Sequence, residues 1–304
     1  MERFRKALES LGIPGHERRD LPESTGRFGD GSQYRLEVPG IQSPEALDAL
    51  VEAASRLGVT INRVTETRGI MRLTDDDIRR MVATAKDAGA ELVLSIGPRA
   101  TYDISAQAKK ENFEAGRIGY RLRGSEQLVR ALADVERATA LGCRGILVYD
   151  EGFLWVLGKL RESGFIPKDT IFKLSAHCGH GNPASLKLLE SIGANSVNVV
   201  RDLPVEILAS IRQTVKIPID IHIDNPSSTG GFIRTYEAPD FIRVGAPIYL
   251  KCGASVFATH AWPTTEKEAA MCAKQASLTQ RMIERFYPEA IQTKAGSRDL
   301  AIPA

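Results

Sequence analysis

Residues 217–226, with the sequence IPIDIHIDNP, alternate between apolar and polar side chains. In an extended strand, the isoleucines fall on one side and Asp220, His222 and Asp224 fall on the other. Two carboxylates around an imidazole can bind a divalent cation or transfer protons. The same row can instead be a buried hydrogen-bond network that bridges neighbouring strands. The loop at residues 227–231, SSTGG, follows with hydroxyl groups and backbone donors.

Strand-like and helix-like segments alternate along most of the chain, which is typical of a parallel sheet covered by helices. The pattern predicts a TIM-type (β/α)8 barrel, and nine candidate strands are found where eight are needed. We therefore expect residues 34–38 or residues 119–122 to lie outside the barrel. An open doubly wound sheet is the alternative, but the sequence has neither GxGxxG after its first strand nor GxxxxGK[ST]. The candidate strands are residues 34–38, 60–65, 91–96, 119–122, 145–149, 171–176, 196–200, 219–223 and 241–250.

Three regions are expected along the chain. Residues 1–33 form an N-terminal helix and arm, residues 34–255 form the barrel, and residues 256–304 form a C-terminal helix and tail. A long amphipathic helix is predicted within the last region, over residues 264–286. Its apolar face can pack on its own barrel or on a second subunit, so a homo-oligomer is one expectation.

The composition describes a soluble globular protein. The 304 residues are 43% hydrophobic and 26% charged, with a net charge of +2. That charge does not favour nucleic acid, and no apolar run reaches the roughly 20 residues that span a membrane. The N-terminus lacks an apolar signal core, so we expect a cytoplasmic protein. The four cysteines form no CxxC pair, and Cys178 lies between His177 and His180.

Reactive groups of a barrel lie at the carboxyl ends of its strands, where the sequence places two histidines. Mixed imidazole and carboxylate ligands suit Zn, Mn, Fe or Co, and the sequence does not choose among these divalent metals. Lys173 or Lys251 could instead form a Schiff base if its pKa were depressed. The predicted metal ligands are His177, His222 and a carboxylate, Asp220 or Glu151. The predicted catalytic residues are His222, His177, Asp224 and Lys173.

A small anionic substrate is predicted from the cationic side chains at the same strand ends, because arginine forks suit carboxylate and phosphate. The loop after the histidine strand occupies a position where barrels often bind phosphate. The alternative is that some of these arginines are solvated or paired with acids at the rim. The predicted substrate-binding residues are Arg68, Arg99, Arg121, Arg123, Asn198, Asn225, Lys251, Ser228 and Gly230.

Residues 196–207, SVNVVRDLPVEI, resemble a segment of the U32 peptidase family. In that family a strand ends in Arg-Glu-Leu, a helix follows, and the next strand carries a histidine near its end, as His222 does here. The resemblance covers about a third of the chain and implies a TIM-like barrel with a site near His177 and His222. The cysteines that hold iron-sulfur clusters in some branches of the family have no counterpart here.

These features lead to three hypotheses. The first is an enzyme acting on a small carboxylated or phosphorylated compound next to a carbonyl, as a lyase, aldolase or isomerase does. A metal or the arginines would then stabilise the developing enolate. The second is a hydrolase that uses a metal-bound water or Cys178 as the nucleophile. The third is a barrel subunit without catalytic activity.

Overall fold

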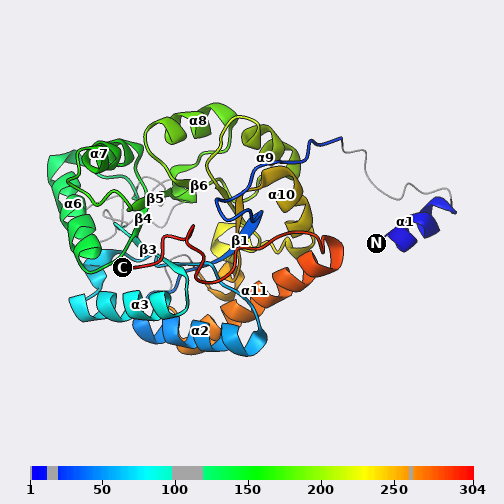
Figure 1. The fold of residues 1–304 in the computed structure, drawn as a ribbon, viewed down its shortest axis with the longest axis horizontal. Coiled ribbons are helices and arrows are strands. Elements are labelled where there is room, and N and C mark those ends of the chain that lie inside the picture. Colours follow the sequence, from blue (N-terminus) through cyan, green and yellow to red (C-terminus); the bar gives the residue numbers. More distant parts are fainter. Residues whose placement is uncertain (1, 12–19, 98–118, 260–262) are drawn as a thin grey trace.

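The computed structural model describes residues 2–11, 20–97, 119–259 and 263–304. Eight parallel strands close into a barrel in which each strand pairs with the next one along the chain, and β8 pairs with β1. This confirms the predicted (β/α)8 fold (Figure 1). The strands are β1 (Tyr34–Pro39), β2 (Arg63–Thr65), β3 (Glu91–Ser95), β4 (Gly145–Val148), β5 (Ile171–Leu174), β6 (Ser196–Asn198), β7 (Ile219–His222) and β8 (Ile248–Lys251).

Two of the predicted strands differ from the structure. Residues 119–122 form a turn and an irregular segment that leads into a helix, so residues 34–38 belong to the barrel and the count falls to eight. Residues 241–245 end helix α10, and only Ile248–Lys251 is a strand. Phe241, Ile242 and Val244 are apolar enough for a strand, but they pack as the buried face of that short helix.

Helices cover the outside of the barrel, and several begin at residues that the sequence marks. Ser43 caps α2 ahead of a proline, and Thr265 forms a capping box at the start of α11. The C-terminal helix α11 packs along α2 of the same chain (Figure 1). No helix in the described ranges is long and apolar enough to cross a membrane. The helices are α1 (Glu2–Glu9), α2 (Pro44–Leu57), α3 (Asp75–Asp87), α6 (Gly124–Ala140), α7 (Glu151–Glu162), α8 (Pro183–Ser191), α9 (Val205–Arg212), α10 (Ala238–Gly245) and α11 (Glu266–Phe286).

The barrel has an apolar layer outside and a charged interior. Leucine, isoleucine and valine side chains fill the space between strands and helices. Inside the barrel, Glu37, Arg63, Lys173 and Asp220 are each no more than 2% exposed. Buried charges are costly unless they are paired, and each of these four has an oppositely charged neighbour in one network. That network forms the floor of the candidate site.

Candidate functional site

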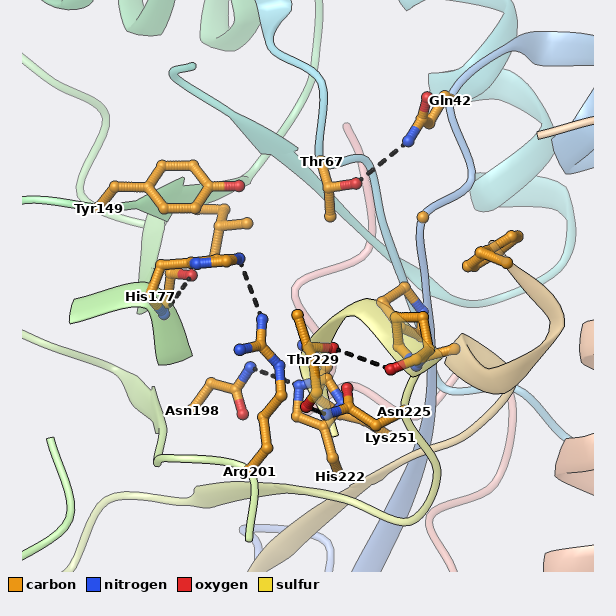
Figure 2. A pocket seen from close by; sticks show the side chains of 17 residues that line it. Gln42, Thr67, Tyr149, His177, Asn198, Arg201, His222, Asn225, Thr229 and Lys251 are labelled. Carbon is orange, nitrogen blue, oxygen red and sulfur yellow. Dashed lines mark hydrogen bonds between the residues drawn. The ribbon is translucent and has the colours of Figure 1, made fainter. Parts of the chain in front are cut away.

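A pocket opens at the carboxyl ends of the strands and encloses about 530 Å³, part of it open to solvent. Five residues predicted from the sequence line this one pocket: His177, Asn198, His222, Asn225 and Lys251. They come from the ends of β5, β6, β7 and β8 (Figure 2). The two imidazoles, which lie on separate strands in the sequence, therefore face the same space. The remaining lining residues are Pro39, Gly40, Gln42, Thr67, Leu147, Tyr149, Ser175, Arg201, Pro226, Thr229, Ala254 and Phe257.

Several lining residues were not among the predicted site residues. Gln42 follows β1 and donates a hydrogen bond from Nε2 to Thr67 Oγ1 at 3.3 Å. It lies three residues beyond the end of β1, in the loop before α2. Arg201 and Tyr149 follow β6 and β4, so the rule of strand ends would have found both.

An ionic network lies beneath the pocket and is centred on Glu37. Its carboxylate pairs with Lys173, with Lys251 Nζ at 3.3 Å and with Arg63 Nη1 at 3.6 Å. Asp220 adds contacts of 2.8 Å to Lys173 Nζ and 3.3 Å to Arg63 Nη1. Burial alone would raise the pKa of Glu37, but Lys173, Lys251 and Arg63 outweigh burial and lower it.

Lys173 and Asp220 therefore occupy positions different from those predicted. Both side chains are 0% exposed and bonded to one another, and neither lines the pocket. Lys173 serves as a counter-ion for two buried carboxylates, not as a group that a substrate can reach. Asp220 lies in the charged layer below His222, not beside it as a second ligand.

Lys251 is the lysine that lines the pocket, and its side chain is 5% exposed. In the orientation that satisfies its neighbours, the Asn198 amide oxygen accepts from Lys251 Nζ at 2.8 Å and from His222 Nε2 at 3.3 Å. Burial and the nearby Lys173 charge lower the pKa of Lys251 to about 7, although Glu37 and Asp220 oppose the shift. Near neutral pH about half of these amines are thus uncharged and nucleophilic.

The two pocket histidines have different partners. Burial and the charges of Lys251, Arg201 and Lys173 hold the pKa of His222 well below its usual value, so its ring is neutral. His177 accepts a hydrogen bond from Arg201 Nη2 at 3.0 Å. The His177 ring also stacks on Tyr120, with centroids 4.0 Å apart and an angle of 14°. The neutral His222 ring can accept a proton at the pocket wall, whereas the Nε2 lone pair of His177 is already used by Arg201.

Asp224 was predicted as a catalytic residue, and the structure places it in a different environment. The strand ends at His222, and the chain then turns so that Asp224 bridges to Ile233. Its carboxylate accepts from Gly253 N at 2.8 Å and from Ala254 N and Ser255 N at 3.2 Å, and it also bonds the Ser255 hydroxyl. Asp224 thus fixes the loop after β8 and does not line the pocket.

The predicted metal ligands are not gathered together. Glu151 bonds His180 Nε2 at 2.5 Å and pairs with Arg121, away from the residues that line the pocket. Within the described ranges, no group of three His, Cys, Asp or Glu side chains could hold a metal ion. Neither predicted carboxylate, Asp220 or Glu151, joins His177 and His222 in the pocket lining.

Most of the predicted rim residues also lie outside the pocket lining. Arg68 is half-buried after β2, and Arg123 is exposed at the start of α6. Ser228 and Gly230 are exposed in the loop after β7, and their neighbour Thr229 lines the pocket instead. Arg99 lies outside the described residues.

Cys178 follows His177 at the rim and is poorly suited to a nucleophilic role. Burial and the nearby Glu151 charge raise the pKa of its thiol, and the opposing Arg121 charge does not compensate. A thiol kept protonated in this way is a weak nucleophile. The other three cysteines are buried.

No model of a known protein family matches this sequence, and no curated protein matches it. Its fold is similar to that of a truncated 3-deoxy-D-arabino-heptulosonate 7-phosphate synthase from Thermotoga maritima, at 12% identity and a TM-score of 0.50, over 90% of this chain and 92% of that chain. Thiamine phosphate pyrophosphorylase from Pyrococcus furiosus is 13% identical, with a TM-score of 0.47, over 84% of this chain and 97% of that chain. A U32 peptidase is 15% identical, with a TM-score of 0.44, over 78% of this chain and 96% of that chain. No family model supports the resemblance to the U32 family that the sequence suggests.

Proposed function

We propose that this barrel is an enzyme that acts on a small carbonyl compound bearing an anionic group, by lyase or isomerase chemistry. The observation that carries the proposal is the position of Lys251, which lines the base of the pocket beside His222; burial there lowers the pKa of its amine to about 7. Such an amine is uncharged often enough to attack a carbonyl at neutral pH. Lys251 thus replaces the metal of the sequence-based hypothesis as the electrophile-forming group.

The reaction begins when Lys251 Nζ forms a bond to the carbonyl carbon and the carbonyl electron pair moves to oxygen. The two amine protons leave with that oxygen as water, and one proton from solvent then gives a protonated imine. This cation draws the electron pair of a bond at the adjacent carbon to form an enamine. A C–H bond breaks as its proton passes to a base, whereas a C–C bond breaks as the hydroxyl on the departing carbon gives its proton to the base and that fragment leaves as a carbonyl compound. Hydrolysis of the imine after proton return releases the product and restores the amine.

His222 is the proposed base, which accepts the proton released when the bond at the adjacent carbon breaks. It is paired in register with Lys251 across β7 and β8, and both residues line the pocket. Its ring is neutral, so it holds a lone pair for that proton. The Lys173 charge beneath the floor helps to keep Lys251 deprotonated between turnovers.

Reductive trapping tests the proposal. The protein is incubated at pH 7 with pyruvate and cyanoborohydride, which reduces an imine to a stable amine, and the modified lysine is located by peptide mass spectrometry. We expect the adduct to form faster at Lys251 than at the exposed Lys159. No adduct is expected at Lys173, which the pocket does not reach. Adducts spread over surface lysines, with none at Lys251, would refute the proposal.

The hydrolase hypothesis is not carried forward, because the protonated Cys178 thiol and the dispersed metal ligands give it no support in the described structure. A bound divalent metal stays a prediction. Elemental analysis of protein purified without chelator tests it directly.

A further inference from the structure

Two buried amide oxygens line the pocket without a hydrogen-bond partner among the described residues: Gln42 Oε1 and Asn225 Oδ1. Gln42 is 8% exposed and Asn225 is 2% exposed. Leaving a buried acceptor unpaired is destabilising, so at a pocket such an oxygen is a candidate acceptor for a donor that a ligand carries. The two residues follow β1 and β7, and both side chains are drawn at the pocket in Figure 2.

The orientation of both amides is fixed by their nitrogen atoms. Gln42 Nε2 donates to Thr67 Oγ1 at 3.3 Å, and Asn225 Nδ2 donates to the Thr229 carbonyl at 2.5 Å. Each oxygen is thereby left as an acceptor without a donor among the described residues. A ligand hydroxyl can donate to such an oxygen, whereas a carboxylate or phosphate oxygen has no proton to give at neutral pH.

The loops where a barrel could bind phosphate are already satisfied by the protein itself. Asp224 takes the backbone amides after β8, at residues 253–255. The Glu66 carboxylate accepts hydrogen bonds from the backbone amides of Gly69 at 3.0 Å and Ser95 at 3.3 Å. In the loop after β7, the amides of residues 229–231 bond carbonyls within the same turn. These three sets of donors are therefore not available to a phosphate group.

Arg201 is the arginine that lines the pocket, and it is held against His177 by the hydrogen bond of 3.0 Å. Its charge also contributes to the low pKa of His222, which places it within electrostatic range of that ring. A single guanidinium fork matches the two oxygens of a carboxylate. Phosphate commonly also requires backbone amides, which are already used in these loops.

We infer that the substrate is an unphosphorylated oxo acid that carries hydroxyl groups, with its carboxylate at Arg201 and its hydroxyls donating to Gln42 and Asn225. The inference rests on the proposed function only for the carbonyl, which would meet Lys251. The carboxylate and hydroxyl contacts stand on the pocket geometry alone. They can therefore be tested with compounds that contain no reactive carbonyl.

Titration calorimetry on the full chain compares three such anions: gluconate, hexanoate and 6-phosphogluconate. Gluconate carries hydroxyls and a carboxylate, hexanoate lacks the hydroxyls, and the third adds a phosphate. We expect gluconate to bind about tenfold or more tightly than hexanoate, because it pairs the amide oxygens, and 6-phosphogluconate to gain nothing from its phosphate. Equal affinity for hexanoate, tighter binding of 6-phosphogluconate, or no binding of gluconate would overturn the inference.

The variant Gln42→Met removes the amide oxygen, together with the hydrogen bond from Nε2 to Thr67 Oγ1, at nearly constant volume. We expect gluconate to lose about tenfold in affinity while the affinity of hexanoate is unchanged. Equal losses for both anions would contradict the assigned hydroxyl contact. The wild-type comparison stands without this variant if it fails to fold.

The inference and the proposed function fail separately. Gluconate selectivity without any trapped adduct at Lys251 would leave the ligand class standing and remove the imine chemistry. Trapping at Lys251 without gluconate selectivity would leave the imine chemistry standing and remove the proposed ligand class.

Discussion

Arg201 donates a hydrogen bond from Nη2 to His177 Nε2 at 3.0 Å, across the mouth of the pocket. A guanidinium has no acceptor, so His177 Nε2 accepts and the ring is protonated on Nδ1. A substrate carboxylate that pairs with Arg201 would draw this donor away and leave the Nε2 lone pair facing the ligand. Substrate binding and the availability of a base at His177 are thereby coupled.

The first prediction concerns Arg201. Replacing it in Arg201→Gln removes a charge-assisted contact, which contributes about 1.5–3 kcal/mol, so gluconate affinity should fall by about ten- to a hundredfold. Calorimetry measures the loss. The matched control is Arg123→Gln at the exposed start of α6, which should leave the affinity unchanged. A loss in the control of the same size would show that bulk charge, not the Arg201 fork, attracts the anion.

The second prediction concerns the pH dependence of imine formation. Burial lowers the pKa of Lys251 to about 7, so the uncharged amine accumulates as the pH rises through neutrality. The initial trapping rate at Lys251 should rise between about pH 6 and pH 8 and then level off. Ordinary surface lysines, with pKa values near ~10.4, should continue to gain reactivity well above that range. A Lys251 rate that climbs in parallel with theirs would contradict the depressed pKa.

The third prediction concerns Lys173, which neutralises Glu37 and Asp220 from a fully buried position. Lys173→Met leaves these carboxylates with fewer counter-ions and should lower the free energy of unfolding by about 3–5 kcal/mol. It should also raise the pKa of Lys251, because one of the charges that depress that pKa is gone. Urea denaturation and the pH profile of trapping measure the two effects. The exposed variant Lys159→Met serves as the control and should alter neither.

A result in which Lys173→Met folds with normal stability would show that the buried network does not need this cation. A result in which stability falls but the pH profile stays in place would separate the structural role of Lys173 from its electrostatic effect on Lys251.

Alternation and strand ends predicted much of this arrangement from sequence. The period-two row at 219–223 predicted His222 at the site, and the carboxyl ends of β5 and β8 predicted His177 and Lys251 there as well; all three line the pocket. These assignments succeed because strand periodicity and the position of a strand end are local properties of the chain. The barrel fold follows from the same local signals repeated eight times.

Two predicted site residues that lie outside the pocket lining are held by partners distant in sequence. The sequence alone predicts Asp220 as a ligand beside His222. In the structure, its carboxylate is ion-paired with Lys173 and Arg63, which come from other strands. Asp224 belongs to the same row by alternation, but the chain bends after His222 and delivers it to the amides of residues 253–255. Pairings of this kind are set by barrel closure, which the sequence does not display locally.

The fourth prediction concerns Asp224, which accepts from three backbone amides and the Ser255 hydroxyl. Asp224→Ala leaves these buried donors unpaired and should cost about 3 kcal/mol or more of unfolding free energy, at roughly 1–3 kcal/mol for each unsatisfied group. Chemical denaturation checks this value against the exposed variant Asp202→Asn, which should be neutral. A variant that kept its stability but lost imine trapping would return Asp224 to the catalytic role that the sequence suggested.

The last prediction concerns Glu151, the carboxylate first assigned to a metal. Burial alone would raise its pKa, but hydrogen bonds from His180 and Arg121 outweigh burial and lower the pKa to about 2. A carboxyl group whose pKa is lowered by folding stabilises the folded state at pH values above its pKa in the unfolded chain, near 4.5. That contribution disappears as the pH falls toward 2. Because the side chain is 26% exposed, solvent screening limits the contribution to under about 1 kcal/mol.

Glu151→Gln should therefore be slightly less stable than the wild type at pH 7, and the difference should shrink between pH 4.5 and pH 2. Denaturation curves across this range measure it, with Glu162→Gln, an exposed carboxylate near the end of the same helix, as the control. The ion pair predicts no change in metal content on substitution, because both partners of Glu151 are cationic or neutral side chains, not a metal. A stoichiometric metal present in the wild type and lost in Glu151→Gln would instead place this carboxylate in a coordination sphere and reverse the assignment.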